Sequence, residues 1–132
     1  MKKVLATLVC ALVASVSFAG EYPDITISEL EDAITKGNVI LLDVNGSSSY
    51  ANGHIPGAID FRANKDKIAS LLGDNKDKLV VAYCGGPTCS AYQAGAKAAE
   101  EAGFKNIKHL SAGISGWLQA GKPTDKADGK KS

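Results

Sequence analysis

Two short, continuous apolar runs constrain the fold of this chain more than any other feature. Residues 39–44 read Val-Ile-Leu-Leu-Asp-Val, and residues 79–83 read Leu-Val-Val-Ala-Tyr. Apolar runs without alternation, rich in β-branched residues, are typical of strands that are covered on both faces. Glycine and asparagine flank the first run, and a glycine-rich loop follows the second. The two runs therefore predict parallel strands inside a buried sheet.

Segments with helical character separate these strands. Ser28, with Glu31 three residues later, predicts a helix start, and Gly37 predicts its end. Strands that alternate with helices predict an α/β domain, in which a central parallel sheet is flanked by helices on both faces. We expect helices at residues 29–35, 47–51, 65–72, 90–102 and 113–120, and a further short strand at residues 104–110.

The first 19 residues have the pattern of a cleaved export signal. Two lysines precede an almost continuous apolar run over residues 4–16, and Ser17 and Ala19 are the small residues that a signal peptidase reads. The run is short for a membrane span, so we expect no stable membrane insertion after cleavage, although a retained anchor is the alternative. Cleavage would leave a domain over residues 20–123 with a flexible tail over residues 124–132. We expect this domain in the periplasm or otherwise outside the cytoplasm.

Composition excludes several classes of partner. The 132 residues carry a net charge of +1 without a basic stripe, so no nucleic-acid partner is expected. A structural metal site needs about four ligands, and besides two cysteines of the domain the chain offers only His54 and His109. We therefore expect neither a metal nor another cofactor.

Cys84 is the candidate nucleophile of the chain. It follows the second apolar run directly, where parallel α/β sheets bind their ligands. Gly85 and Gly86 allow successive amide N–H groups to turn toward an anion, and the start of the next helix adds a positive dipole end. Both features lower the pKa of a thiol and stabilise a thiolate. The alternative is an inert, buried cysteine at a strand end.

Cys89 stands five residues after Cys84 in the same loop. A disulfide that closes so small a loop restricts the unfolded chain little, so a chemical role is favoured over a stabilising one. Outside the cytoplasm, the two thiols can oxidise to a persistent disulfide. Cys89 is therefore a candidate resolving thiol, or else a small residue tolerated at a helix start.

Four segments together resemble the rhodanese, or thiosulfate sulfurtransferase, family. Residues 53–58 read Gly-His-Ile-Pro-Gly-Ala, which is the most specific of the four when a cysteine loop follows it. The resemblance covers the chain from about residue 25 to residue 123. The other matching segments are the Asp-containing strand at residues 41–44, the cysteine loop at residues 83–90, and a C-terminal motif at residues 111–117 and 120–123.

The resemblance implies a single-domain sulfurtransferase. A small sulfur donor would load Cys84 with a sulfane sulfur, and a thiol acceptor would take it from the resulting persulfide. Asp43 and His54 would order the loops around the site, while Gly113 and Trp117 would pack the last helix. The active-site loop would consist of Gly85, Gly86, Pro87, Thr88 and Ser90 together with the two cysteines.

The sequence departs from the family pattern at two positions. Asn45 stands where the family strand has an arginine, and Cys89 replaces the arginine of the loop. Because a guanidinium suits an oxyanion, its loss disfavours thiosulfate as donor. The missing arginine also disfavours a phosphatase activity. The resemblance implies that phosphatases of this fold use that arginine and a longer loop. Arg62, the only arginine of the chain, either reaches the pocket or lies on the surface.

Two other functions remain open at this point. Cys84 and Cys89 can cycle between dithiol and disulfide in a redox protein. A rhodanese-like domain can also act as a binding module without turnover. The sequence does not distinguish these from a sulfur carrier, and it does not identify the donor, the acceptor or the oligomeric state.

Overall fold

The computed structural model describes residues 22–127. At its centre lies a parallel sheet of four strands in the order β2-β1-β3-β4. The strands are β1 (Val39–Asp43), β2 (Ile59–Asp60), β3 (Leu79–Tyr83) and β4 (Ile107–His109). The helices are α1 (Ile27–Lys36), α2 (Ser47–Asn52), the 3-10 turn η1 (Lys65–Lys67), α3 (Ile68–Leu72), α4 (Tyr92–Glu101) and α5 (Gly113–Gln119).

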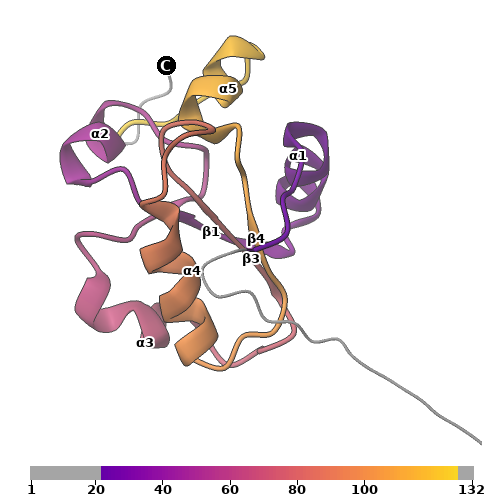
Figure 1. Ribbon diagram of the computed structural model, residues 1–132, viewed down its shortest axis with the longest axis vertical. Coiled ribbons are helices and arrows are strands. Elements are labelled where there is room, and N and C mark those ends of the chain that lie inside the picture. The colour runs from indigo at the N-terminus through magenta and orange to yellow at the C-terminus, as the bar shows by residue number, and fades with distance from the viewer. Residues whose placement is uncertain (1–21, 128–132) are drawn as a thin grey trace, which may run out of the picture.

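Helices cover both faces of the sheet (Figure 1). Successive residues of a strand point to opposite faces, so each strand divides its side chains between two cores. Leu42 and Ala82 pack with α3 and α4 on one face. Leu41 and Val81 pack with α1 and α5 on the other face. The predicted α/β class is confirmed, and the two cores explain why the strand sequences do not alternate.

The first helix begins two residues earlier than predicted. Thr26 is its N-cap and accepts from the Glu29 N–H at 3.0 Å, while the Glu29 carboxylate accepts from the Thr26 N–H at 3.0 Å. Ser28 lies inside the helix, so the capping box of Ser28 and Glu31 is wrong. The cap needs an extended backbone, which Thr26 has. Gly37 ends the helix as predicted, with a φ of 69°.

Other element boundaries depend on tertiary contacts. The helix predicted over residues 65–72 is divided into η1 and α3, and α4 begins at Tyr92 rather than at residue 90. Strand β2 has two residues and is defined by its pairing with β1, so no apolar run in the sequence predicted it. At the opposite edge, the backbone of residues 23–25 bonds to His109 of β4.

The C-terminal segment returns across the domain. Trp117 Nε1 donates to the Pro123 carbonyl at 2.7 Å, and Thr124 is buried. Asp125 and His54 exchange backbone hydrogen bonds of 3.0 and 2.9 Å. The tail predicted from Thr124 is therefore part of the fold to at least Ala127, whose N–H donates to the Ala51 carbonyl. Residues 128–132 lie outside the described part of the chain.

Within residues 22–127, no helix combines the length and apolar character needed to cross a membrane. The predicted signal segment, residues 1–19, lies outside the described residues. Export and cleavage remain predictions.

Candidate active site

The cysteine loop lies at the carboxyl end of β3, as predicted. Cys84 follows the last strand residue and is 2% exposed, in the core that β3 shares with α4. Gly85 and Gly86 are half-buried, whereas Pro87, Thr88 and Ser90 are exposed. The loop turns between Gly86 and Cys89 through a backbone hydrogen bond of 3.1 Å. The loop therefore has a buried start and an exposed crest.

The first turn of α5 fixes the orientation of two peptide groups in this loop. The Ile114 N–H donates to the Cys84 carbonyl at 2.9 Å, and the Ser115 N–H donates to the Gly85 carbonyl at 2.9 Å. The peptides are trans, so the N–H of Gly85 and the N–H of Gly86 point away from α5. Neither N–H has a hydrogen-bond acceptor within residues 22–127. These two donors are available to an anion on the other side of the loop.

Cys84 and Cys89 form a disulfide in this structure. Their Cα atoms are 6.3 Å apart, which is within the usual range of about 4.4–6.8 Å for a disulfide. Cys89 is half-buried and packs against the same core as Cys84. The loop therefore brings the candidate nucleophile and the candidate resolving thiol into bonding contact.

Asp43 is buried on the opposite face of the sheet from Cys84. Its carboxylate accepts from the Asn45 N–H and from the Tyr83 hydroxyl, each at 2.8 Å. The Tyr83 hydroxyl accepts in turn from the Ile55 N–H at 3.0 Å. Burial raises the pKa of Asp43, although the bonds from Asn45 and Tyr83 oppose that shift. Burial and the neighbouring Asp43 also raise the pKa of Tyr83.

This chain of hydrogen bonds joins the two central strands to residues 53–58. Asp43 ends β1, Tyr83 ends β3, and Ile55 lies in the Gly-His-Ile-Pro-Gly-Ala segment. Asp43 thus links the end of β1 to Tyr83, the residue that precedes the cysteine loop. The part of Tyr83 in this network was not predicted from the sequence. Its signal was a hydroxyl at the end of an otherwise apolar run.

His54 connects α2 to the C-terminal segment. Its Nδ1 lies 2.8 Å from the Tyr50 carbonyl, and its ring stacks on the Tyr50 ring with centroids 3.7 Å apart. The Tyr50 hydroxyl donates to the Ala58 carbonyl at 2.8 Å. With its backbone paired to Asp125, His54 orders the loops at this end of the sheet. Tyr50 lies four residues before His54, whereas Asp125 lies near His54 only in the folded chain, and neither contact was predicted from the sequence.

Arg62 is exposed and follows β2. Strand β2 lies two positions from β3 in the sheet, so neighbouring-strand spacing separates their ends by about 10 Å. Of the two roles left open by the sequence, the surface position is the one observed.

A family model for the rhodanese-like domain matches residues 26–120. The match includes both central strands, the cysteine loop and α5. The chain belongs to the rhodanese family.

The similar proteins of this family carry different names. The chain is 37% identical over 107 residues to the HTH-type transcriptional regulator Rv0324 of Mycobacterium tuberculosis, covering 73% of this chain and 46% of the regulator. It is 32% identical over 109 residues to the dual specificity phosphatase Cdc25 of Arabidopsis thaliana, with 75% of each chain covered. The chain thus spans less than half of the regulator and three quarters of the phosphatase.

The rhodanese fold is also found in a solved sulfurtransferase. The thiosulfate sulfurtransferase of Pseudomonas aeruginosa superposes with a TM-score of 0.70 at 26% identity. The superposition covers 98% of this chain and 25% of the sulfurtransferase. The likeness corresponds to about a quarter of that enzyme, so it supports the rhodanese architecture alone.

Proposed function

We propose that this chain is an exported sulfurtransferase, which carries sulfane sulfur as a persulfide on Cys84 and passes it to a thiol acceptor. The observation that carries the proposal is the orientation of the loop peptides. Helix α5 binds the carbonyls of Cys84 and Gly85, so the N–H groups of Gly85 and Gly86 are left for an anion. A thiolate and a persulfide are both anions that such donors stabilise.

The sulfur transfer consists of two displacements at sulfur. The Cys84 thiolate attacks the sulfane sulfur of a donor such as a polysulfide or an organic persulfide. The S–S bond of the donor breaks, and its remaining thiolate leaves. An acceptor thiolate then attacks the outer sulfur of the Cys84 persulfide, takes that sulfur, and restores the Cys84 thiolate. The cycle is redox-neutral, and the protein carries one sulfur atom between two substrates.

A phosphatase activity has less support from the loop, in spite of the similarity to a protein with that name. Phosphate recognition by this fold relies on a loop arginine, and Cys89 stands at that position. Residues 84–90 include no lysine or arginine. Two backbone N–H groups without a loop cation suit a singly charged sulfur anion better than a phosphate dianion.

Export is supported by the N-terminal pattern of two lysines, an apolar run and small residues. The disulfide between Cys84 and Cys89 agrees with this location, because disulfides persist in oxidising compartments. A reductant of the dithiol class would have to open it before Cys84 could accept sulfur. The proposed carrier is thus active in its reduced form.

The disulfide also favours a second function, that of a dithiol redox protein. In this cycle, two thiols and an oxidised partner disulfide exchange to give the Cys84–Cys89 disulfide and a reduced partner. The two functions make different predictions for the fate of sulfur, because the redox cycle never forms a persulfide.

Mass spectrometry of the reduced protein after treatment with polysulfide distinguishes these functions. A sulfur carrier gains about 32 Da, the mass of one sulfur atom, on its thiolate. Cys84→Ser should remove the gain and keep the circular dichroism spectrum of the wild-type chain. A gain that persists in Cys84→Ser would refute the site assignment. Because Cys89 can convert a Cys84 persulfide into the disulfide, the same treatment is applied to Cys89→Ser. A disulfide in the wild-type chain with no added mass in Cys89→Ser would favour the redox protein, and no change in either protein would favour a binding module.

A further inference from the structure

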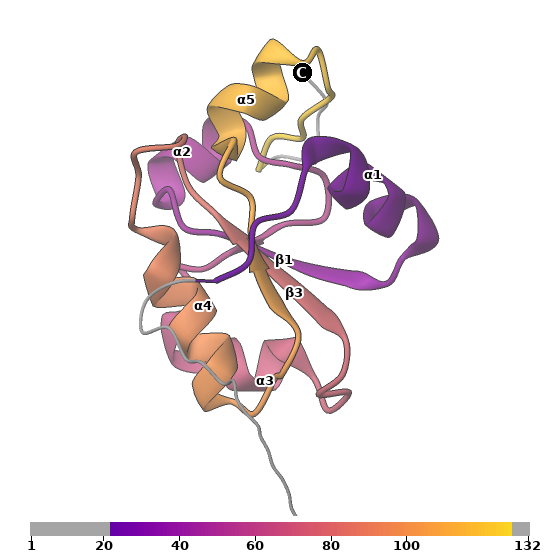
Figure 2. The same cartoon turned by 45° about the vertical axis from the view of Figure 1, so that its right-hand side comes forward.

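The disulfide of the cysteine loop has one buried end and one accessible end. Cys84 is 2% exposed and belongs to the core between β3 and α4. Cys89 is only half-buried, and its neighbours Thr88 and Ser90 are exposed. The loop lies at the same end of the domain as α2 and α5 in two views (Figures 1 and 2). A nucleophile from solvent can therefore reach Cys89 in the folded chain, whereas Cys84 is closed to it.

Access matters because a disulfide is reduced by attack on one of its two sulfur atoms. The attacking thiolate forms a bond to that sulfur while the other sulfur leaves as a thiolate. Attack on Cys84 would require the loop to open first, since Cys84 has almost no exposed surface on any side. Attack on Cys89 needs no such opening. The burial of the two residues thus favours Cys89 as the sulfur that is attacked.

The thiolate of Cys84 is also the better leaving group. The N–H groups of Gly85 and Gly86 have no acceptor within residues 22–127, and they face away from α5, as does the side chain of Cys84. Such donors stabilise a thiolate, and a stabilised thiolate leaves faster. The N–H of Cys89, by contrast, already donates to the Gly86 carbonyl at 3.1 Å. Access and leaving-group stability therefore favour the same direction of cleavage.

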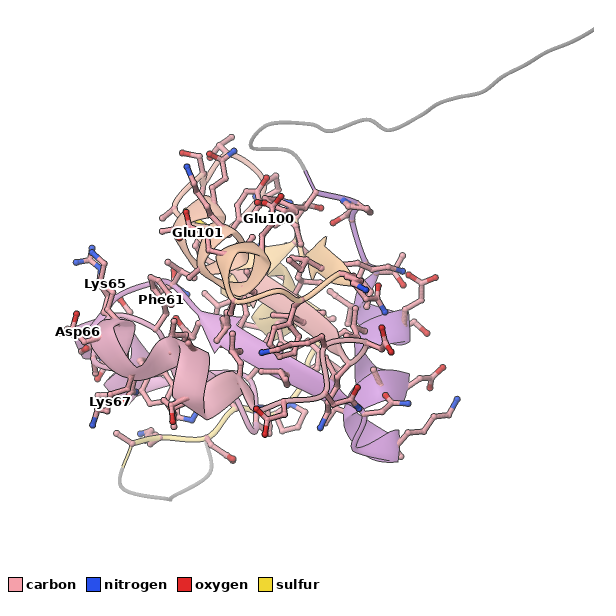
Figure 3. All side chains as sticks on the ribbon, turned by 90° about the horizontal axis from the view of Figure 1, so that it is seen from below. Phe61, Lys65, Asp66, Lys67, Glu100 and Glu101 are labelled. Carbon is pink, nitrogen blue, oxygen red and sulfur yellow. A yellow bond between two sulfur atoms is a disulfide. The ribbon has the colours of Figure 1, made fainter. Side chains whose placement is uncertain are left out.

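Neither the loop nor the first turn of α4 carries a charge that would direct a thiolate to one sulfur. Residues 84–90 include no acidic or basic residue. The first charged residue of α4 is Lys97, five residues after the helix start and so about 7.5 Å along its axis. Glu100 and Glu101 follow in the last turn, and Figure 3 shows both on α4 at the surface. Exposed charges at such distances are largely screened at physiological salt.

We propose that a dithiol reductant activates the oxidised chain by attacking Sγ of Cys89, so that Cys84 is the first thiolate released. The proposal rests on the sulfur-carrier function and names the partner that prepares its site. One thiolate of the reductant bonds to Cys89, and the bond between the two cysteines breaks. The second thiolate of the reductant then attacks its own sulfur in this mixed disulfide, and Cys89 leaves as a thiolate. Two electrons pass to the protein, and the reductant leaves as a disulfide.

The closeness of the two cysteines explains why the reductant is a dithiol. A monothiol on Cys89 would lie next to the released Cys84 thiolate, since the Cα atoms of the two cysteines are 6.3 Å apart. Cys84 would attack Cys89 again, expel the monothiol and restore the disulfide. The second thiol of a dithiol competes with this return, because it is also held beside the mixed disulfide.

Mapping of the first mixed disulfide tests which sulfur is attacked. The oxidised full chain is treated with 2-mercaptoethanol, an uncharged monothiol, and quenched in acid while most of the disulfide is still intact. Digestion with pepsin and fragmentation mass spectrometry, both in acid, then locate the adduct. We expect the adduct on Cys89 to exceed that on Cys84 by more than about tenfold, because exposing Cys84 first requires a local opening.

The same chain unfolded in concentrated urea is the matched control. Unfolding exposes both cysteines and removes the fixed loop peptides, so the two adducts should then agree within about threefold. An adduct mainly on Cys84 in the folded chain, or equal adducts on the two cysteines, would overturn the proposal. A preference for Cys89 that persists in urea would show that the local sequence, and not the fold, selects the sulfur.

The kinetics of reduction give a second measurement, which does not need the mixed disulfide to accumulate. The rate of reduction by dithiothreitol should rise in proportion to its concentration and change less than about twofold in urea below the unfolding transition, because no opening precedes attack on Cys89. Attack on the buried Cys84 would pass through an opened loop. The rate would then level off at high dithiothreitol or rise steeply with urea, and either result would contradict the proposal.

Neither measurement involves sulfane sulfur, so this inference and the carrier function can fail separately. The chain reduced by dithiothreitol is freed of reductant and treated with polysulfide, and its mass is measured. An adduct on Cys89 without sulfur uptake by the reduced chain would keep the assignment of the attacked sulfur and refute the carrier. Sulfur uptake together with an adduct on Cys84 would keep the carrier and refute attack at Cys89.

Discussion

Gly113 lies directly against the backbone of Gly85. A Cβ on Gly113 would be 2.5 Å from the carbonyl carbon of Gly85 and 2.6 Å from the N atom of Gly86. The φ of Gly113 is 64°, in the left-handed region where glycine carries little cost. This close approach allows the N–H groups that follow Gly113 to reach the carbonyls of the cysteine loop. The first residue of α5 therefore determines the shape of a loop that lies 28 residues earlier in the chain.

Gly113→Ala should lower the free energy of unfolding by about 3 kcal/mol, because the strained φ and the clash with backbone act together. Gly121→Ala is the matched control. Gly121 has a φ of 74° but open space around its Cβ position, so its loss should be only about 1 kcal/mol. Chemical denaturation of the three proteins measures both values. Equal losses would mean that α5 does not hold the loop through this contact.

Cys89→Ser should prolong the life of the persulfide on Cys84. In the wild-type chain, the Cys89 thiolate can attack Sγ of the persulfidated Cys84, which expels hydrosulfide and forms the observed disulfide. The serine variant lacks that attack. Without added thiol, it should release less sulfide after polysulfide loading, measured by a sulfide electrode together with intact mass. Unchanged sulfide release would leave Cys89 without a resolving role.

Thiosulfate should be a poorer donor than polysulfide, because the loop has no cation for the sulfonate end. The measurement is kcat/KM for the two donors with a common acceptor. Arg62→Ala should leave both values unchanged. Arg62 is exposed and follows β2, which is separated by β1 from the strand that carries the cysteine loop. Cys89→Arg restores the family residue and should improve the relative use of thiosulfate. A selective loss of thiosulfate activity in Arg62→Ala would show that Arg62 does reach the donor.

Asp43 should lower the free energy of unfolding as the pH rises. Burial raises its pKa above the ordinary value of 3.8, so the folded chain holds the proton more strongly than the unfolded chain. The stabilising contribution of the protonated Asp43 is fully present below pH 3.8, and it is lost as the pH rises through the pKa of the folded chain. The free energy of unfolding of the wild-type chain, minus that of Asp43→Asn, should fall over that interval. A difference that rises with pH would mean that the bonds from Asn45 and Tyr83 outweigh burial.

The local sequence determined the parts of the fold that depend on neighbouring residues. The apolar runs, interrupted only by Asp43, predicted β1 and β3, because strands buried on both faces have no alternation to show. Gly37 ended α1, since its left-handed backbone stops the helix. The order of strand, cysteine loop and helix also placed Cys84 correctly at the carboxyl end of β3.

The tertiary structure decided what the loop can do. Peptide orientation in residues 84–86 depends on hydrogen bonds from α5, and nothing in the loop sequence encodes that distant partner. The Asp43 network likewise needs Tyr83 and Ile55, which the sheet brings together from 40 and 12 positions along the chain. Strand β2 and the ordering of Thr124 arise in the same way, from pairing and burial against segments far away in sequence. Local chemistry pointed to Cys84 as the candidate nucleophile, whereas contacts between distant segments built its environment.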